Sequence, residues 1–166
     1  MRRRTLLAAA GAAAVPALPP AQAEGAVDVA LVIVVDVSRS IDEDEARLQR
    51  EGYRNAVADP VVVAAIRGGM IGAIAVAYVE WAGIEYQRTI IPWRRIGSQA
   101  DADSWSAALA EAARSSLSWT SISGGIRHSR GLLAECPWEA TRRVIDVSGD
   151  GVNNSGPPAD RERDAA

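Results

Sequence analysis

The feature that most restricts the fold is the run of residues 27–35 (VDVALVIVV), which is apolar and rich in β-branched side chains. A run of this kind is typical of a strand that is buried on both faces of a sheet. Residues 70–81 (MIGAIAVAYVEW) form a second such run, and residues 141–147 (TRRVIDV) predict another strand. A shorter strand is predicted at residues 85–93, joined to the second one as a hairpin through Gly83.

Helical patterns lie between these strands. Residues 40–43 (SIDE) fit a capping box that begins a helix ending near residue 59. The inward stripe of this helix is predicted to contain Ile41, Leu48, Gly52 and Ala56. Further helices are expected at residues 101–112 and 122–135, and residues 159–166 begin another. Strands alternating with helices predict an α/β, Rossmann-like three-layer fold with a mostly parallel central sheet, in which ligands bind at the carboxyl ends of the strands.

Residues 1–23 have the three parts of an export signal. A basic start at residues 2–4 precedes the short apolar run 6–15 and the small residues 21–23 (AQA), after which Glu24 would begin the mature chain. The apolar run is too short to span a bilayer. Since Arg3 and Arg4 also resemble a twin-arginine signal, both the Sec and the twin-arginine routes remain open. We therefore predict a periplasmic or secreted protein whose residues 24–166 form one domain.

Charge and composition exclude several functions. The chain has 18 basic and 21 acidic residues, and the predicted signal contains three of the basic ones, so the mature charge is 15 − 21 = −6. This charge disfavours a nucleic-acid or anionic-membrane partner. Every basic residue is arginine, which excludes a phosphate-binding P-loop lysine, a pyridoxal Schiff base and a lysine nucleophile. The single cysteine, Cys136, cannot form an internal disulfide.

Three polar elements carry the predicted chemistry. Asp36-x-Ser38-x-Ser40 directly follows the first buried strand, where a turn can aim one carboxylate and two hydroxyls at a point, a set of hard oxygen donors suited to Mg²⁺. Thr120 lies just before the helix at 122–135, and Asp150 lies in the glycine-rich turn after the strand at 141–147. Each also has an ordinary structural interpretation: Ser40 and Thr120 could cap helices, and Asp150 could be a turn residue.

In this order and spacing, the three elements resemble the metal-ion-dependent adhesion site (MIDAS) of von Willebrand factor A (VWA) domains. The sequence TRRVIDVSGDGVNN at 141–154 is similar to that of secreted bacterial VWA-like proteins grouped as a domain of unknown function, and the resemblance covers about residues 26–166. It implies that the two serines and the threonine bind the ion directly and that the carboxylates act directly or through water. The implied metal ligands are Asp36, Ser38, Ser40, Thr120 and Asp150.

The resemblance also implies partners and a departure from the family pattern. The ion would be Mg²⁺, with Mn²⁺ or Ca²⁺ as alternatives, and the partner would be a protein or peptide that offers a carboxylate to the metal. The VWA fold usually continues through two more strands and helices after the Asp150 turn, so we expect this chain to be incomplete at its C-terminus. The strand at 141–147 would then be an unprotected sheet edge.

Particular residues argue against three alternative sites. Residues 146–151 resemble the start of an EF-hand loop, but Pro157 stands where a bidentate glutamate is needed. A phosphatase of the Asp-x-Asp type needs a carboxylate where Ser38 stands. A serine hydrolase would need His128, the only histidine, which we expect to be a solvated position on its helix because no Gly-x-Ser-x-Gly elbow accompanies it.

Two functions therefore remain open. We predict a metal-dependent binding module rather than an enzyme; the alternative is a hydrolase that uses the same cation as a Lewis acid. The sequence offers no positioned base beyond the two carboxylates already used as ligands. Of the tryptophans, which are expected mostly to pack in the core, Trp119 is a candidate for lining the metal face. Glu80 could support the site or could simply end its strand.

Overall fold

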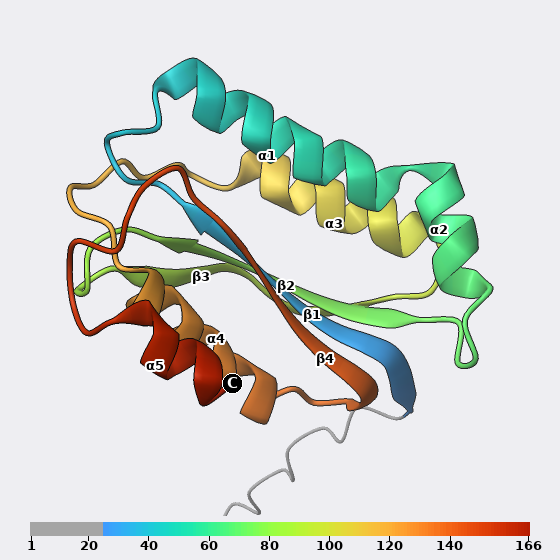
Figure 1. The fold of residues 1–166 in the computed structure, drawn as a ribbon. Helices are drawn as coiled ribbons and strands as arrows, with labels where there is room; N and C mark the ends of the chain where they lie inside the picture. The colour runs from blue at the N-terminus through green and yellow to red at the C-terminus, as the bar shows by residue number, and fades with distance from the viewer. Residues whose placement is uncertain (1–24) are drawn as a thin grey trace, which may run out of the picture.

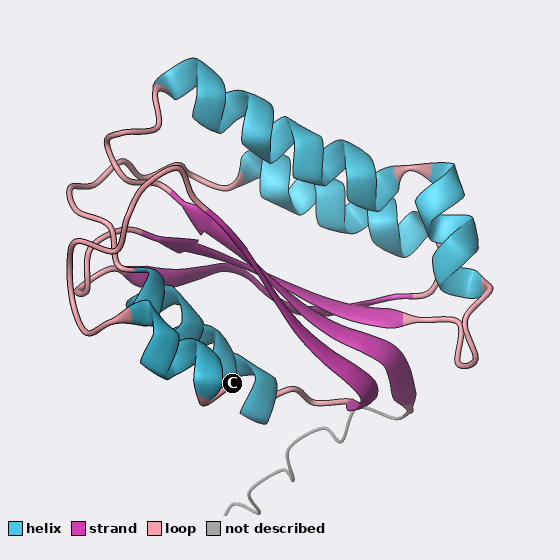
Figure 2. Cartoon of the chain, viewed as in Figure 1, coloured by secondary structure: helices cyan, strands magenta, loops and turns pink. Residues whose placement is uncertain are grey.

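The computed structural model describes residues 25–166, and the predicted export signal lies outside them. The elements, in chain order, are β1 (Ala26–Asp36), α1 (Glu43–Ala58), α2 (Pro60–Arg67), β2 (Ile74–Trp81), β3 (Gln87–Ile96), α3 (Gln99–Glu111), α4 (Ile122–Ala134), β4 (Glu139–Ser148) and α5 (Ala159–Asp164). They form three layers, a sheet between two groups of helices (Figures 1 and 2). None of the helices within residues 25–166 is both long and apolar enough to cross a membrane.

The sheet has the order β3-β2-β1-β4. Strand β1 pairs in parallel with β2 and with β4, so that Val29 lies opposite Ile74 on one side and Arg142 on the other. Strand β3 is antiparallel to β2 and is reached by the predicted hairpin. The α/β fold with a mostly parallel sheet is thus confirmed. The carboxyl ends of β1 and β4 lie at the same edge of the sheet, because the two strands run parallel.

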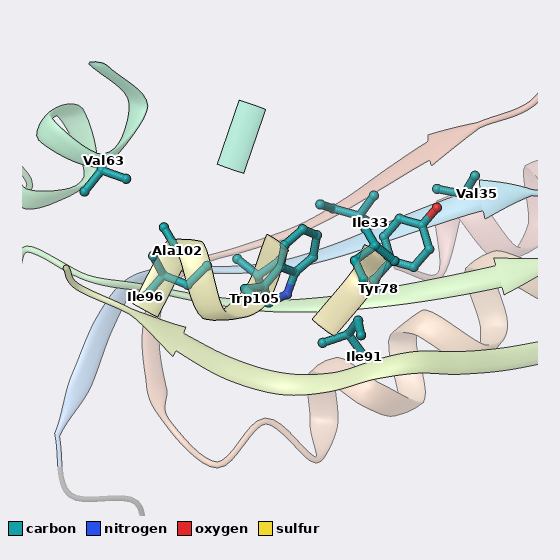
Figure 3. Close-up of a cluster of buried hydrophobic side chains, with 10 residues drawn as sticks. Ile33, Val35, Val63, Tyr78, Ile91, Ile96, Ala102 and Trp105 are labelled. Atoms are coloured by element: carbon teal, nitrogen blue, oxygen red, sulfur yellow. The ribbon is translucent and has the colours of Figure 1, made fainter. Parts of the chain in front are cut away.

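Alternation along the strands sends side chains to opposite faces of the sheet. Ile33, Val35 and Tyr78 face α1 and α3, where the ring of Tyr78 meets that of Trp105 edge-on at 6.2 Å between centroids (Figure 3). Val34 and Trp81 face the other side, where residues of α4 pack against them. Burial on both faces explains why β1 and β2 read as nearly continuous apolar runs.

Several local predictions were wrong in detail. Helix α1 is capped by Asp42, which accepts a hydrogen bond from the Glu45 N–H at 2.8 Å, and not by Ser40. Its predicted stripe is misplaced: Leu48 is 60% exposed, whereas Arg50 is buried. Strand β2 begins at Ile74 rather than at residue 70, because residues 70–73 form a turn, and α2 was not predicted.

Candidate metal site

The predicted site residues come from three loops that lie together at one end of the sheet. Asp36 is the last residue of β1, and Ser38 and Ser40 follow it. Thr120 precedes α4, and Asp150 follows β4. These loops gather on the left in Figure 1, at the carboxyl ends of β1 and β4. The arrangement follows from the parallel pairing of β1 with β4, which brings residues more than 100 positions apart to one edge.

Asp36 is fully buried. Its Oδ1 accepts a hydrogen bond from the Ser38 backbone N–H at 2.7 Å, and its Oδ2 is buried without a hydrogen-bond partner. A Cβ atom at Gly149 would lie 3.1 Å from that Oδ2, so the loop after β4 passes close over the carboxylate. Burial, opposed by the hydrogen bonds from Ser38 and reinforced by the charge of Asp150, raises the pKa of the Asp36 carboxyl.

A chain of hydroxyls joins the first loop to the second carboxylate. The Oγ atoms of Ser38 and Ser40 are 2.8 Å apart, and the Ser40 hydroxyl donates to Asp150 Oδ1 at 2.9 Å. Ser40 is therefore engaged toward Asp150 and not toward the amide groups of α1. The helix-cap interpretation of Ser40 is excluded by this geometry.

Thr120 is also not the cap of its helix. The cap of α4 is Ser121, whose Oγ accepts from the Gly124 N–H at 3.2 Å. Thr120 itself is buried, and a Cβ at Gly151 would lie 3.7 Å from its Oγ1, which brings this hydroxyl beside the loop that carries Asp150. All five predicted residues thus lie in the same cluster of loops.

Two asparagines that were not predicted as site residues hold these loops together. Asn154 accepts from the Thr120 N–H through its Oδ1 at 2.8 Å, and its own N–H donates back to the Thr120 carbonyl at 3.0 Å. Asn153 accepts from the Ser123 N–H at 3.2 Å. Their adjacency within the Gly-Asp-Gly-x-Asn-Asn segment was the available signal, but a pairing with residues some 30 positions earlier could not be deduced from it.

The donors are hard oxygen atoms, two carboxylates and three hydroxyls. Within residues 25–166, no group of three or more His, Cys, Asp and Glu side chains is placed to hold a metal ion. Three of the five groups in the cluster are therefore neutral hydroxyls, and the cluster carries only two formal negative charges. An oxygen set of this composition suits a cation such as Mg²⁺, Mn²⁺ or Ca²⁺. The buried Asp36 Oδ2 fits a bound cation, which would supply its missing partner.

The other singled-out residues lie outside this cluster or at its edge. The prediction that His128 is solvated was wrong: it is half-buried, its Nε2 lies 3.0 Å from Thr89 Oγ1 of β3, and burial lowers its pKa. Glu80 is buried in an ion pair with Arg50 of α1, on the sheet face covered by α1 and α3. Trp119 is 67% exposed, whereas Trp81 is fully buried in the core.

Comparison with known proteins identifies relatives of the sequence and of the fold. The family described as "Protein of unknown function (DUF1194)" matches residues 26–166. No curated protein matches. Among solved structures, proximal thread matrix protein 1 from the mussel byssus is 15% identical, with a TM-score of 0.64 over 86% of this chain and 36% of that one. The pilus adhesin SpaC from Lactobacillus rhamnosus GG is 18% identical, with a TM-score of 0.52 over 80% of this chain and 16% of that one.

A third similar structure is the vWF domain of the pilus tip protein Mfa5 from Porphyromonas gingivalis, 18% identical with a TM-score of 0.49 over 77% of this chain and 39% of that one. The chain thus spans well under half of the length of these structures. Another structure of the mussel protein is described as having a zinc-occupied MIDAS motif. The fold shared with the mussel protein and with SpaC is VWA-like.

Proposed function

Since this chain belongs to the DUF1194 family of unknown function and has a VWA-like fold, we propose that it is an exported module that binds a protein or peptide through one divalent cation. The proposed metal ligands are Asp36, Ser38, Ser40, Thr120 and Asp150. Residues 24–166 would form the binding domain, with residues 1–23 removed on export to the periplasm or the medium.

The observation that carries the proposal is the burial of the Asp36 carboxylate with its Oδ2 unpartnered. A carboxylate buried with one oxygen unpartnered is costly, because ionised groups lose hydration on burial and normally recover it through pairing or metal coordination. Asp150, the second carboxylate, is connected to Asp36 through Ser38 and Ser40. Two carboxylates hydrogen-bonded to the same pair of serines repel one another, and a cation between them would turn that repulsion into attraction.

The donor set also indicates the ligand class. Two carboxylates neutralise a divalent cation only formally, and three neutral hydroxyls are weak donors. The ion would stay electrophilic, with room for a further oxygen ligand. A hard cation in that state prefers an anionic oxygen, so an Asp or Glu side chain of a partner is the expected ligand. Mg²⁺ is the proposed ion, with Mn²⁺ or Ca²⁺ as alternatives.

A hydrolase using the same cation is the weaker proposal. General-base catalysis requires a group within hydrogen-bond reach of the attacking water. His128, the only histidine of the chain, is instead hydrogen-bonded to Thr89, the third residue of β3. The two carboxylates of the site would themselves be metal ligands. Binding is therefore the better-supported function.

Calorimetric titration of the purified protein with Mg²⁺, Mn²⁺, Ca²⁺ and Zn²⁺ tests the site; zinc is included because of the mussel protein. We expect one ion per chain, and binding should be lost in Ser38→Ala. Ser104→Ala, the same exchange at an exposed position on α3, is the matched control and should bind normally. No divalent binding at millimolar concentration would refute the proposal. Export is tested separately: the N-terminus of the exported protein should be Glu24, and an intact Met1 would contradict the signal.

A further inference from the structure

Trp119 has an unusual backbone and an unusual surface position. Its φ is 72°, and among the described residues it is the non-glycine residue with a positive φ. This left-handed conformation is rare for a bulky side chain and costs about 1–2 kcal/mol. The indole is nevertheless 67% exposed, so burial of the ring does not compensate for the strain. Strained residues of this kind cluster at ligand-binding sites.

The conformation is imposed by contacts on both sides of Trp119. Before it, the Leu117 N–H donates to the Val37 carbonyl at 3.1 Å, just after β1. After it, the Ser121 N–H donates to the Ala82 carbonyl at 2.7 Å, just after β2. The Trp119 side chain then lies directly over Gly83, where an added Cβ would be only 3.0 Å from Trp119 Cβ. Hydrogen bonds to the ends of β1 and β2 thus fix the backbone around Trp119, and its ring is exposed to solvent next to the proposed metal site.

Trp119 lines a hollow of about 590 Å³ together with residues 83–86, Leu117, Ser118, Asn154 and Ser155. Most of its polar side chains already have partners. Ser155 Oγ accepts from the Ile84 N–H at 3.1 Å, Asn154 Oδ1 accepts from Thr120, and the Tyr86 hydroxyl donates to Ser115 at 2.8 Å. What remains available is mostly apolar surface, which favours an apolar guest over a sugar that needs many hydrogen bonds.

The hollow adjoins the proposed metal site through two connections. Thr120, a proposed metal ligand, is the next residue after Trp119, and Asn154 both lines the hollow and holds the Thr120 N–H. Glu85 also lines the hollow and is exposed. Its negative charge repels an acidic side chain of a partner, which would therefore bind at the cation and not in the hollow. The ends of a short peptide could reach both places, because an extended chain advances about 3.3–3.6 Å per residue.

We propose that this hollow is a specificity pocket for an acidic peptide: the peptide gives its Asp or Glu carboxylate to the cation and places a large apolar side chain, one to three residues away, against Trp119. This inference rests on the proposed metal-dependent function. It adds an apolar residue to the acidic one that the metal would bind, so the recognised motif is an acidic residue with an apolar residue one to three positions before or after it.

Blocked glycine peptides with one central Asp provide the test, with a Leu scanned through the three positions on either side. Binding is measured by calorimetry in saturating Mg²⁺, and tryptophan fluorescence reports contact with the exposed ring. Burial of one Leu side chain should make the best Leu peptide bind about 10- to 100-fold more tightly than the host without Leu, with a blue shift of the emission. Replacement of the Asp by Asn in that peptide should abolish binding.

Variants separate the pocket from the metal site. Trp119→Ala should lose the preference for Leu while binding Mg²⁺ and the Leu-free Asp peptide as before. Trp119→Gly, which accepts the positive φ without strain, should behave in the same way, so a folding defect is distinguishable from a lost contact. Met70→Ala is the control, since Met70 is 90% exposed but precedes β2, at the opposite end of that strand from Gly83.

The possible results are distinct. If Mg²⁺ and the Asp peptide bind but Leu gives no gain at any position, the pocket inference fails while the proposed function stands. A Leu preference that survives in Trp119→Ala would place the apolar contact elsewhere and also overturn it. An Arg peptide that gains more than the Leu peptide would overturn the apolar assignment in favour of Glu85 as the recognising group. Absence of binding of every divalent cation tested would overturn both proposals.

Discussion

Replacing Asp36 by asparagine isolates the contribution of one buried negative charge to the proposed metal site. Asparagine has nearly the same shape, and its side-chain oxygen can still accept the Ser38 N–H that Asp36 Oδ1 accepts at 2.7 Å. The other atom, now an amide nitrogen, takes the place of the buried and unpartnered Oδ2. The exchange therefore keeps the turn after β1 and removes the charge that a cation would neutralise.

The magnitudes follow from linkage. A ligand that binds only the folded protein, at about 100 times its dissociation constant, stabilises it by about 2.7 kcal/mol. Unfolding entropy near 2.1 cal/mol/K per residue gives about 0.3 kcal/mol/K for a domain of this size, so Mg²⁺ should raise the Tm of the wild-type protein by about 9 °C. Without metal, relief of a buried charge opposes the cost of a buried unpartnered amide, and Asp36→Asn should change the free energy of unfolding by less than about 1 kcal/mol.

Thermal melts in a chelator and in Mg²⁺ measure both quantities. Asp36→Asn should melt near the wild-type temperature in chelator and should show no increase in Tm with Mg²⁺. Asp146→Asn is the matched control, because Asp146 is exposed on β4, close in sequence to Asp150 but outside the cluster. Asp146→Asn should keep the full increase in Tm with Mg²⁺. A Mg²⁺ shift as large in Asp36→Asn as in wild type would refute the assignment of Asp36, and equal loss in Asp146→Asn would show that the effect is not local.

Three further predictions concern stability. Arg50→Met leaves the buried Glu80 carboxylate without its partner and should lower the free energy of unfolding by about 3–5 kcal/mol in urea titrations; a loss below about 1 kcal/mol would contradict the importance of the pair. Asp28 accepts the Ile71 and Gly72 N–H groups, bonds that lower its pKa, so its contribution is present above its ordinary pKa and is lost as the pH falls through the lowered one. Asp28→Asn should therefore be less stable than wild type at pH 7, and the difference should shrink in acid; a constant difference would argue against ionisation as the cause. Trp119→Gly should be more stable than Trp119→Ala by about 1 kcal/mol, because glycine accepts a φ of 72° without strain; equal melts would show that the backbone relaxes instead.

Much of the fold could be predicted from local patterns. The strand at 27–35 was recognised because burial on both faces removes the usual alternation of polar and apolar residues. The hairpin to β3 and the helix α4 were predicted for similar reasons, since each is specified by residues close in sequence. The candidate site could be predicted in the same way, because each of its residues lies at or just after the end of a strand or just before a helix.

Where polar groups had several possible partners, the sequence could not choose. Ser40 fits a helix cap, but a cap was already available in Asp42, and Asp150, distant in sequence, became the partner of Ser40. The burial of Arg50 and the exposure of Leu48 followed likewise from Glu80, a buried carboxylate that the sequence pattern of α1 cannot reveal. In both cases the deciding interaction is a direct contact between residues that are far apart in the sequence.

The sequence by itself determined the layered α/β fold and the candidate set of oxygen donors, because hydrophobic periodicity and strand-end motifs are local properties. The tertiary structure decided how those donors connect, with Asp36 buried and Asp150 reached through Ser38 and Ser40. It also decided the conformation of Trp119, which depends on hydrogen bonds to the ends of two different strands. Such properties arise only when strands far apart in the chain are paired side by side, because only then do the polar groups at their ends compete for the same partners.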